Sequence, residues 1–308
     1  MRVYELPITT EYVSSWGLRE MVREVFQNAI DQKNWEYSLD PFTVTNYDCK
    51  LSKQALLLGH STKGDNQIGK FGEGLKLAML VAARNSIPFS IHSGDEVWRP
   101  RIIRSKRYEA DILGVDVSKR KYRDDLTVTI HCDIEPNWLP LTTDDQILPD
   151  SPGKIYVGGL WVCDVKDLRY GYNFRPSQLS LDRDRRLAST FNILWAIALS
   201  WRTQPLSEQV ELIESDAPDA EYLDELTYSS SLADELALRF INTYGSNSVA
   251  VTTQGELSDV TKPVIVSEPM KKLLQRSKLY NPADLVKPQW EDILCNECLE
   301  KANEANLL

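Results

Sequence analysis

Three glycines stand within six residues, Gly69, Gly72 and Gly74, in the pattern G-x-x-G-x-G, directly before an apolar run that begins at Leu75. Glycine loses more backbone freedom on folding than any other residue, so this spacing indicates a loop that needs conformations only glycine adopts readily. Backbone N–H groups at the start of a helix bind anions, and phosphate is a common ligand there. The pattern therefore predicts a phosphate-binding loop followed by a helix, and a flexible loop without a ligand is the alternative.

A second constraint is an amphipathic pattern over residues 15–36, where apolar residues recur every three or four positions. They are Leu18, Met21, Val22, Val25, Phe26, Ala29 and Ile30. Glu24, Asn28 and Asp31 project from another side of the expected helix within one narrow sector, because each helical residue advances by about 100°. A solvated helix face explains these three residues equally well when the helix is considered alone.

The rest of the chain predicts an α+β protein with three parts. Alternating residues predict strands at 42–47, 89–92, 96–103 and 126–132, and the helix after the glycine pattern is expected to end near residue 84. Ser14 or Ser15 is the expected N-cap of the first helix. We predict a domain at 1–150, a segment at 151–203 opened by a hairpin that turns at Gly158-Gly159, and a C-terminal α/β-helical region at 204–308.

Composition excludes several classes of protein. The 308 residues are 42% hydrophobic and 26% charged, which is typical of a soluble chain large enough for more than one core. No apolar run approaches the roughly 20 residues of a membrane span, and the N-terminus lacks the apolar core of a signal peptide, so we expect a cytoplasmic protein. The net charge of −10 leaves nucleic-acid binding possible but not favoured.

Two local features have simple explanations. Cys295 and Cys298 form a C-x-x-C without a second pair nearby, and two cysteines on one helical turn explain it better than a zinc or redox site. The acidic stretch at residues 211–225 carries no Lys or Arg, so we expect a surface segment or a linker.

Three motifs in order resemble those of the GHKL ATPase superfamily, which includes the heat-shock-90 chaperones, DNA gyrase B, MutL, MORC proteins and histidine kinases. Residues 24–31 (EVFQNAID) match the family's E-x-x-x-N-A-x-D, residues 59–63 (GHSTK) resemble its G-x-S-x-K segment, and the glycine pattern matches its G-x-x-G-x-G. The resemblance is clear over residues 15–132 and fainter up to residue 186. It implies a Bergerat-type ATP-binding sandwich, with helices on a mixed, mainly antiparallel sheet, followed by a transducer-like α/β region and a helical tail.

The resemblance also implies a role for each matching residue. Glu24 would orient and deprotonate the attacking water, and Asn28 would bind Mg²⁺. The residues implied to bind ATP are Asn28, Asp31, Asp48, Ser61, Lys63, Gly69, Phe71, Gly72, Gly74 and Lys76. In related proteins a basic residue of the transducer region reaches the γ-phosphate, and the choices here are Lys154, Arg183, Arg185 and Arg186.

One motif departs from the family pattern. The adenine-binding D-x-G-x-G is represented only by Asp48-Cys49-Lys50-Leu51-Ser52, which lacks both glycines. The motif therefore does not specify the preferred base, and Asn46 is the alternative contact. Two functions stay open on the sequence: an ATP hydrolase, or a nucleotide-gated binding module with negligible turnover that acts through protein partners. A protein partner or a homodimer is expected in both.

Overall fold

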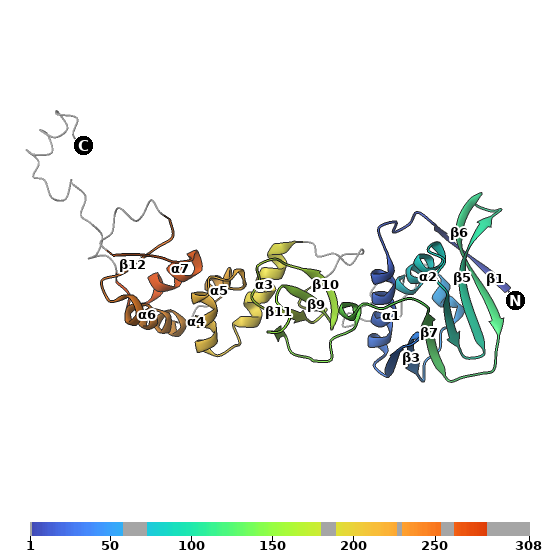
Figure 1. The fold of residues 1–308 in the computed structure, drawn as a ribbon, viewed down its shortest axis with the longest axis horizontal. Coiled ribbons are helices and arrows are strands. Elements are labelled where there is room, and N and C mark those ends of the chain that lie inside the picture. Colours follow the sequence, from blue (N-terminus) through green and yellow to red (C-terminus); the bar gives the residue numbers. More distant parts are fainter. Residues whose placement is uncertain (1, 58–72, 180–188, 227–229, 254–261, 282–308) are drawn as a thin grey trace, which may run out of the picture. The chain divides into compact units, whose positions relative to one another are not determined.

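The computed structural model describes residues 2–57, 73–179, 189–226, 230–253 and 262–281 (Figure 1). The chain forms two compact units. One comprises Met1–Val165 and Gly171–Ala188, and the other comprises Lys166–Tyr170 and Ser189–Leu308. The chain therefore passes between the units three times. The domain boundaries expected at residues 150 and 203 stay predictions.

The first unit contains a seven-stranded sheet in the order β1-β6-β5-β4-β7-β3-β2, and each neighbouring pair is antiparallel. Its strands are β1 (Arg2–Thr9), β2 (Trp35–Leu39), β3 (Phe42–Tyr47), β4 (Phe89–Ser93), β5 (Glu96–Ser105), β6 (Ala110–Lys119) and β7 (Asp125–Ile130). The α+β class and the mainly antiparallel sheet are thus confirmed. In β3, Phe42 and Val44 are buried, while Thr43 and Thr45 point to the other face of the sheet, as the two-residue period of a strand requires. Both threonines pair with threonines of β7.

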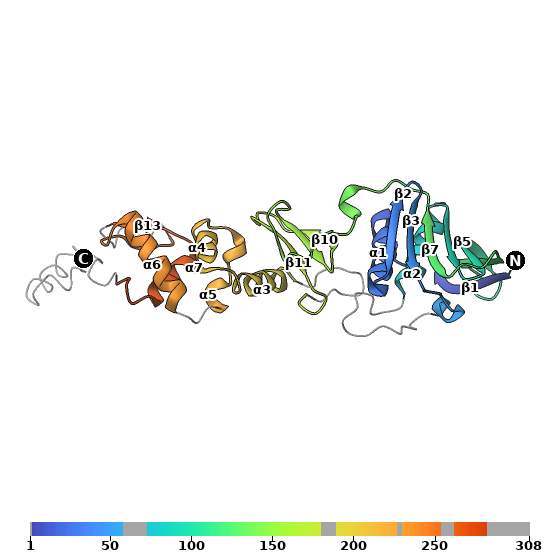
Figure 2. The ribbon, with the colours of Figure 1, turned by 90° about the horizontal axis from the view of Figure 1, so that it is seen from below.

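Two helices bury their apolar faces against this sheet. Helix α1 (Leu18–Gln32) packs on β2 and β3, and α2 (Gly74–Arg84) packs on β4, β5 and β6 (Figure 2). The Phe26 ring of α1 meets Trp35, Tyr37 and Phe42 at ring-centroid distances of 5.9, 5.5 and 5.3 Å. Such tilted aromatic pairs each add about 0.5–1.5 kcal/mol beyond the area they bury, so they hold α1 firmly on β2 and β3.

The boundaries of α1 differ from those expected. The N-cap is Gly17, not Ser14 or Ser15, and its N–H donates to Glu20 Oε2 at 2.8 Å. The helix ends at Gln32 because Lys33 adopts a positive φ of 69°, and β2 begins at Trp35, where the sequence pattern continued the helix.

Strand β6 was not expected from the sequence. Its interior Gly114 and two aspartates lower its strand propensity. The structure gives a reason for the glycine, because a Cβ at Gly114 would lie 2.8 Å from Cγ2 of Ile103 on β5. Close approach of the two strands therefore requires a residue without a side chain at this position.

After η2 (Pro136–Trp138), the first unit continues with a four-stranded sheet in the order β10-β9-β11-β8. Its strands are β8 (Ile147–Leu148), β9 (Lys154–Val157), β10 (Leu160–Asp164) and β11 (Gly171–Phe174). The expected hairpin at residues 154–164 is confirmed, and its turn residues Gly158 and Gly159 have φ values of 59° and 79°. Positive φ at both positions is the geometry that favours glycine in a two-residue hairpin turn.

The second unit is mainly helical. Its elements are α3 (Thr190–Trp201), α4 (Leu206–Glu214), η3 (Pro218–Ala220), α5 (Leu223–Leu226), α6 (Ser230–Tyr244), β12 (Val249–Val251), β13 (Pro263–Ile265) and α7 (Glu268–Arg276). Strands β12 and β13 form a parallel pair.

The expectation that residues 211–225 form a surface segment or a linker was wrong. Asp219 and Asp224 from this stretch are each 1% exposed. The Asp219 carboxylate accepts the backbone N–H groups of Arg169 at 2.8 Å and Tyr170 at 3.3 Å. The Asp219 carboxylate thus holds the backbone of Arg169 and Tyr170 in place. The composition of the acidic stretch does not reveal this contact, because its partners lie far away in the sequence.

Candidate functional site

Helix α1 places Glu24 and Asn28 one turn apart, next to each other on the helix surface. The Glu24 side chain is almost fully buried, with 1% exposure, whereas Asn28 is partly exposed. Asn28 Nδ2 donates to the Glu24 backbone oxygen at 2.7 Å, which holds the Asn28 side chain along the helix. The sequence therefore supplies a buried carboxylate and an adjacent amide from the same helix.

The Glu24 carboxylate lies directly against Gly74, the last glycine of the G-x-x-G-x-G pattern and the first residue of α2. A Cβ at Gly74 would collide with Glu24 Oε2 and would lie 3.0 Å from Glu24 Cδ. The structure thus brings together one residue from each of the two strongest motifs, which are 50 positions apart in the sequence. The absence of a side chain at Gly74 makes room for the carboxylate.

Arg23 is a residue of this site that the sequence patterns did not identify. Its side chain is 9% exposed, and Nη2 lies 3.4 Å from Glu24 Oε1. The guanidinium also lies 5.5 Å from the ring centre of Trp16. The Arg23 guanidinium therefore lies against the Glu24 carboxylate within the buried part of the helix. The available signal was a charged pair inside the buried stretch from Met21 to Gln27.

Lys76 is buried, with 2% exposure, and its ammonium donates to the backbone oxygen of Ala55 at 2.8 Å. Ala55 belongs to η1 (Lys53–Leu56), so this hydrogen bond ties the first turn of α2 to the segment before the glycine motif. Burial lowers the pKa of Lys76 from its ordinary value, and the charge of Glu73 acts in the opposite direction. The proposed phosphate contact of Lys76 would require its ammonium to exchange partners.

The two alternative adenine contacts lie in different surroundings. Asp48 follows β3, is exposed, has a positive φ of 52°, and donates its N–H to the Asp124 oxygen at 3.2 Å. Asn46 is 5% exposed, and its Nδ2 donates to the Ala29 backbone oxygen of α1 at 3.1 Å. Asn46 therefore contacts the helix that carries Glu24, while Asp48 lies at the surface.

Asp31 is partly exposed in the last turn of α1. Several predicted residues lie outside the part of the chain that the structure describes. They are Ser61, Lys63, Gly69, Phe71 and Gly72 of the ATP site, Arg183, Arg185 and Arg186 of the basic group, and the Cys295–Cys298 pair. Lys154 is described, and its ammonium donates to Asn137 Oδ1 at 3.3 Å.

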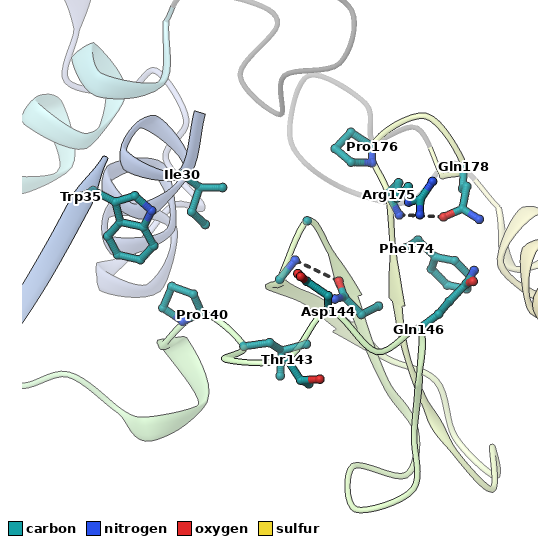
Figure 3. A pocket seen from close by; sticks show the side chains of 14 residues that line it. Ile30, Trp35, Pro140, Thr143, Asp144, Gln146, Phe174, Arg175, Pro176 and Gln178 are labelled. Carbon is teal, nitrogen blue, oxygen red and sulfur yellow. Dashed lines mark hydrogen bonds between the residues drawn. The ribbon is translucent and has the colours of Figure 1, made fainter. Parts of the chain in front are cut away.

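The first unit also contains a pocket of about 570 Å³, a volume in the range of small-molecule sites (Figure 3). It is lined by Ile30, Trp35, Pro140, Leu141, Thr143, Asp144, Gln146, Gly158, Gly159, Asn173, Phe174, Arg175, Pro176 and Gln178. None of the described site residues from the sequence analysis lines it. Two polar side chains of the pocket hydrogen-bond to the backbone of other lining residues. Asn173 Oδ1 accepts the Gly159 N–H and Gln178 Oε1 accepts the Arg175 N–H, each at 2.9 Å.

Comparison of the chain with protein-family models and with curated proteins finds no match. Within the described residues, no cluster of three or more His, Cys, Asp or Glu side chains is arranged to hold a metal ion. Among the same residues, none of the helices combines the length and apolar character needed to cross a membrane.

Proposed function

We propose that this chain binds ATP with Mg²⁺ and hydrolyses it, as a GHKL-type ATPase with a Bergerat-type fold. The contact between the Glu24 carboxylate and Gly74 carries the proposal. It brings the proposed general base of the E-x-x-x-N motif next to the glycine motif that is expected to bind the phosphates. Because Gly74 has no side chain, the carboxylate lies directly against the N-terminal end of α2, where a phosphate would bind. The motif order, which resembles that of the family, supports the same conclusion.

The residues present suit Mg²⁺, which prefers a few hard oxygen ligands and retains several waters. Asn28 would supply its side-chain oxygen, since Nδ2 is directed to the Glu24 backbone oxygen. When bound, the ion would neutralise charge on the phosphate oxygens. Glu24 would accept a proton from the attacking water, and backbone N–H groups at the start of α2 would stabilise charge on the transferred phosphate.

The remaining parts of the proposal follow the family resemblance. Asp31 and Lys76 would support the ATP site, with Ser61, Lys63 and the glycine loop covering the phosphates. One of Lys154, Arg183, Arg185 and Arg186 would reach the γ-phosphate from the transducer-like region. ATP binding would then change the position of that region and the engagement of a protein partner or a second copy of the chain, with the cytoplasm as the site of action.

A nucleotide-gated binding module is the second candidate, and one observation favours it. Asp48, the expected adenine contact, is exposed and in the left-handed region, and it lacks the glycines that accompany it in the family. A site with a weakened base contact and slow turnover would still act as a clamp that closes on a partner.

Two variants separate these functions. Glu24→Gln removes the base while keeping the size of the side chain, and Asn28→Ala removes the proposed Mg²⁺ ligand. For an ATPase, we expect E24Q to bind a non-hydrolysable ATP analogue with Mg²⁺ in isothermal titration. Its rate of phosphate release should be at least about 10²-fold lower than that of the wild type. N28A should weaken that binding at least about tenfold, which corresponds to about 1.4 kcal/mol.

Glu20→Gln is the matched control, because Glu20 lies one turn earlier on the same helix and hydrogen-bonds the N-cap Gly17. Unchanged phosphate release in E24Q would contradict the hydrolase. Tight binding by a wild-type protein that releases no phosphate above the rate of E24Q would establish the clamp instead. No binding by the wild type would refute both functions.

A further inference from the structure

Arg19, in the first turn of α1, connects the helix of the proposed ATP site to strand β10 of the four-stranded sheet. Its guanidinium stacks 3.8 Å from the ring centre of Trp161. The same group donates from Nη2 to the backbone oxygen of Val162 at 2.5 Å. Two contacts of different kinds to consecutive residues fix both the position and the orientation of the guanidinium.

The carbonyl that Arg19 binds lies at an irregularity of the β9–β10 pair. Trp161 pairs with Tyr156 and Cys163 pairs with Ile155, so Val162 is an extra residue on β10, a β-bulge. A bulged residue is left out of the strand ladder, and its polar backbone groups need other partners when they are buried. Val162 is 7% exposed, and Arg19 supplies a hydrogen bond to its oxygen.

The surroundings of Trp161 reinforce this anchor. The Trp161 indole N–H donates to Asp164 Oδ1 at 3.2 Å, which orients the ring. The Lys154 ammonium lies 5.1 Å from the ring centre and also binds Asn137. Leu160, at the start of β10, is 3% exposed and belongs to the same apolar core as α1. Strand β10 is therefore attached to α1 by an apolar contact, a stacked cation and a hydrogen bond.

We propose that Arg19 is a positioning residue for the ATP site, and that through its contacts with Trp161 and Val162 the nucleotide state at Glu24 and Asn28 is coupled to the four-stranded sheet. Glu24 lies five residues after Arg19 on the same helix, so a shift of α1 that nucleotide produces also displaces the guanidinium from the bulge. This inference rests on the proposed function, because it needs a nucleotide bound beside α1.

The test is hydrogen–deuterium exchange of residues 160–164, measured with and without a non-hydrolysable ATP analogue and Mg²⁺. Arg19→Met keeps the aliphatic length of the side chain and removes the charge, both contacts with β10 and the 4.0 Å ion pair with Glu20. Without nucleotide, exchange in β10 should rise about tenfold in R19M, which is the factor expected for losing one hydrogen bond and one cation–π contact. Arg2→Met is the matched control, because Arg2 lies 5.1 Å from the Tyr4 ring on β1, outside this contact.

Coupling between two sites is reciprocal, and this provides a quantitative check. The factor by which nucleotide slows or speeds β10 exchange in the wild type should equal the factor by which R19M changes the dissociation constant of nucleotide. A residue with a merely structural role would change exchange in β10 without this equality. Phosphate release should also fall in R19M through kcat, because α1 is no longer held in one position.

Arg19→Lys is the second variant, and it keeps the charge. An ammonium cannot stack flat on the indole and reach the Val162 oxygen together, so R19K should behave like R19M in β10 exchange. The coupling is overturned if wild-type β10 exchange does not respond to bound nucleotide, or if R19M and R19K respond as the wild type does. If the wild type binds no nucleotide, the proposed function fails as well, whereas a nucleotide-binding wild type without a β10 response refutes the coupling alone.

Discussion

Replacing Gly74 by alanine separates the stability of the first unit from the chemistry of the proposed site. The backbone of Gly74 tolerates a side chain, since its φ lies outside the left-handed region and it opens α2. The new Cβ would collide with Glu24 Oε2 and would stand 3.0 Å from Cδ and 3.6 Å from Cγ of the same side chain. The obstacle is thus the end of one flexible side chain and not a neighbouring backbone.

The magnitude follows from opposing effects. Alanine is favoured over glycine in a helix by about 1 kcal/mol, and inserting a methyl group into a packed region costs about 1–3 kcal/mol. We therefore expect the free energy of unfolding of G74A to differ from that of the wild type by less than about 2 kcal/mol. The Glu24 carboxylate must move, however, so phosphate release should fall about 10²-fold, which corresponds to about 2.7 kcal/mol in the activation barrier.

Urea unfolding and phosphate release, measured on the same preparations, test this prediction. Gly17→Ala is the control, because a Cβ there would meet only Glu20 Oε2 at an ordinary distance of 3.8 Å. G17A should keep the turnover of the wild type. If G74A hydrolyses ATP at the wild-type rate, the contact between Glu24 and Gly74 has no catalytic importance, and the main support for the proposed function is lost.

Two further predictions concern titratable groups. Burial raises the pKa of Cys163 to about 11. Its alkylation at pH 8 should therefore be about two orders of magnitude slower in the folded protein than in urea. Peptide mass spectrometry would measure both rates, and equal rates would contradict the burial. Burial also raises the pKa of Asp224 against the opposing charges of Lys272 and Arg276, so its carboxylate lowers stability as pH rises from the ordinary Asp pKa through the folded one. Asp224→Asn should therefore be equal to or up to about 1 kcal/mol more stable than the wild type at pH 7 in urea unfolding, with the difference closing below pH 4, and a clear loss of stability at pH 7 would refute this.

Local patterns predicted much of the architecture. The apolar stripe of α1, the alternation in β3 and β7, and the glycine pair of the β9–β10 turn each contain their own signal within a few residues. The end of α1 was misplaced because the apolar pattern does not show that the backbone of Lys33 leaves the helical region, with a positive φ of 69°. Strand β6 was not predicted because the reason for its Gly114, close contact with Ile103 on the neighbouring strand, is visible only in the structure.

The candidate site was predicted only in part, for the same physical reason. Glu24 and Asn28 share one helix, so their spacing was visible in the sequence. The contact of Glu24 with Gly74 and the binding of Asn46 to α1 depend on how helices and sheet pack together. Arg19 is the extreme case, because the carbonyl it binds is 143 positions away. The hydrogen bond from Arg19 is explained by the β-bulge at Val162, and this bulge has no sequence signature.

The hydrogen bonds of Asp219 bear on how this protein can be divided or recombined. Its carboxylate holds the backbone of Arg169 and Tyr170, so a five-residue excursion of the chain, Lys166–Tyr170, belongs with the helices that follow residue 189. A fragment that starts at residue 189 would lose two donors to a carboxylate that is 1% exposed. A fragment that ends at residue 165 would lose β11, the central partner of β8 and β9. Neither unit is therefore a contiguous module, and gene shuffling would have to transfer both together.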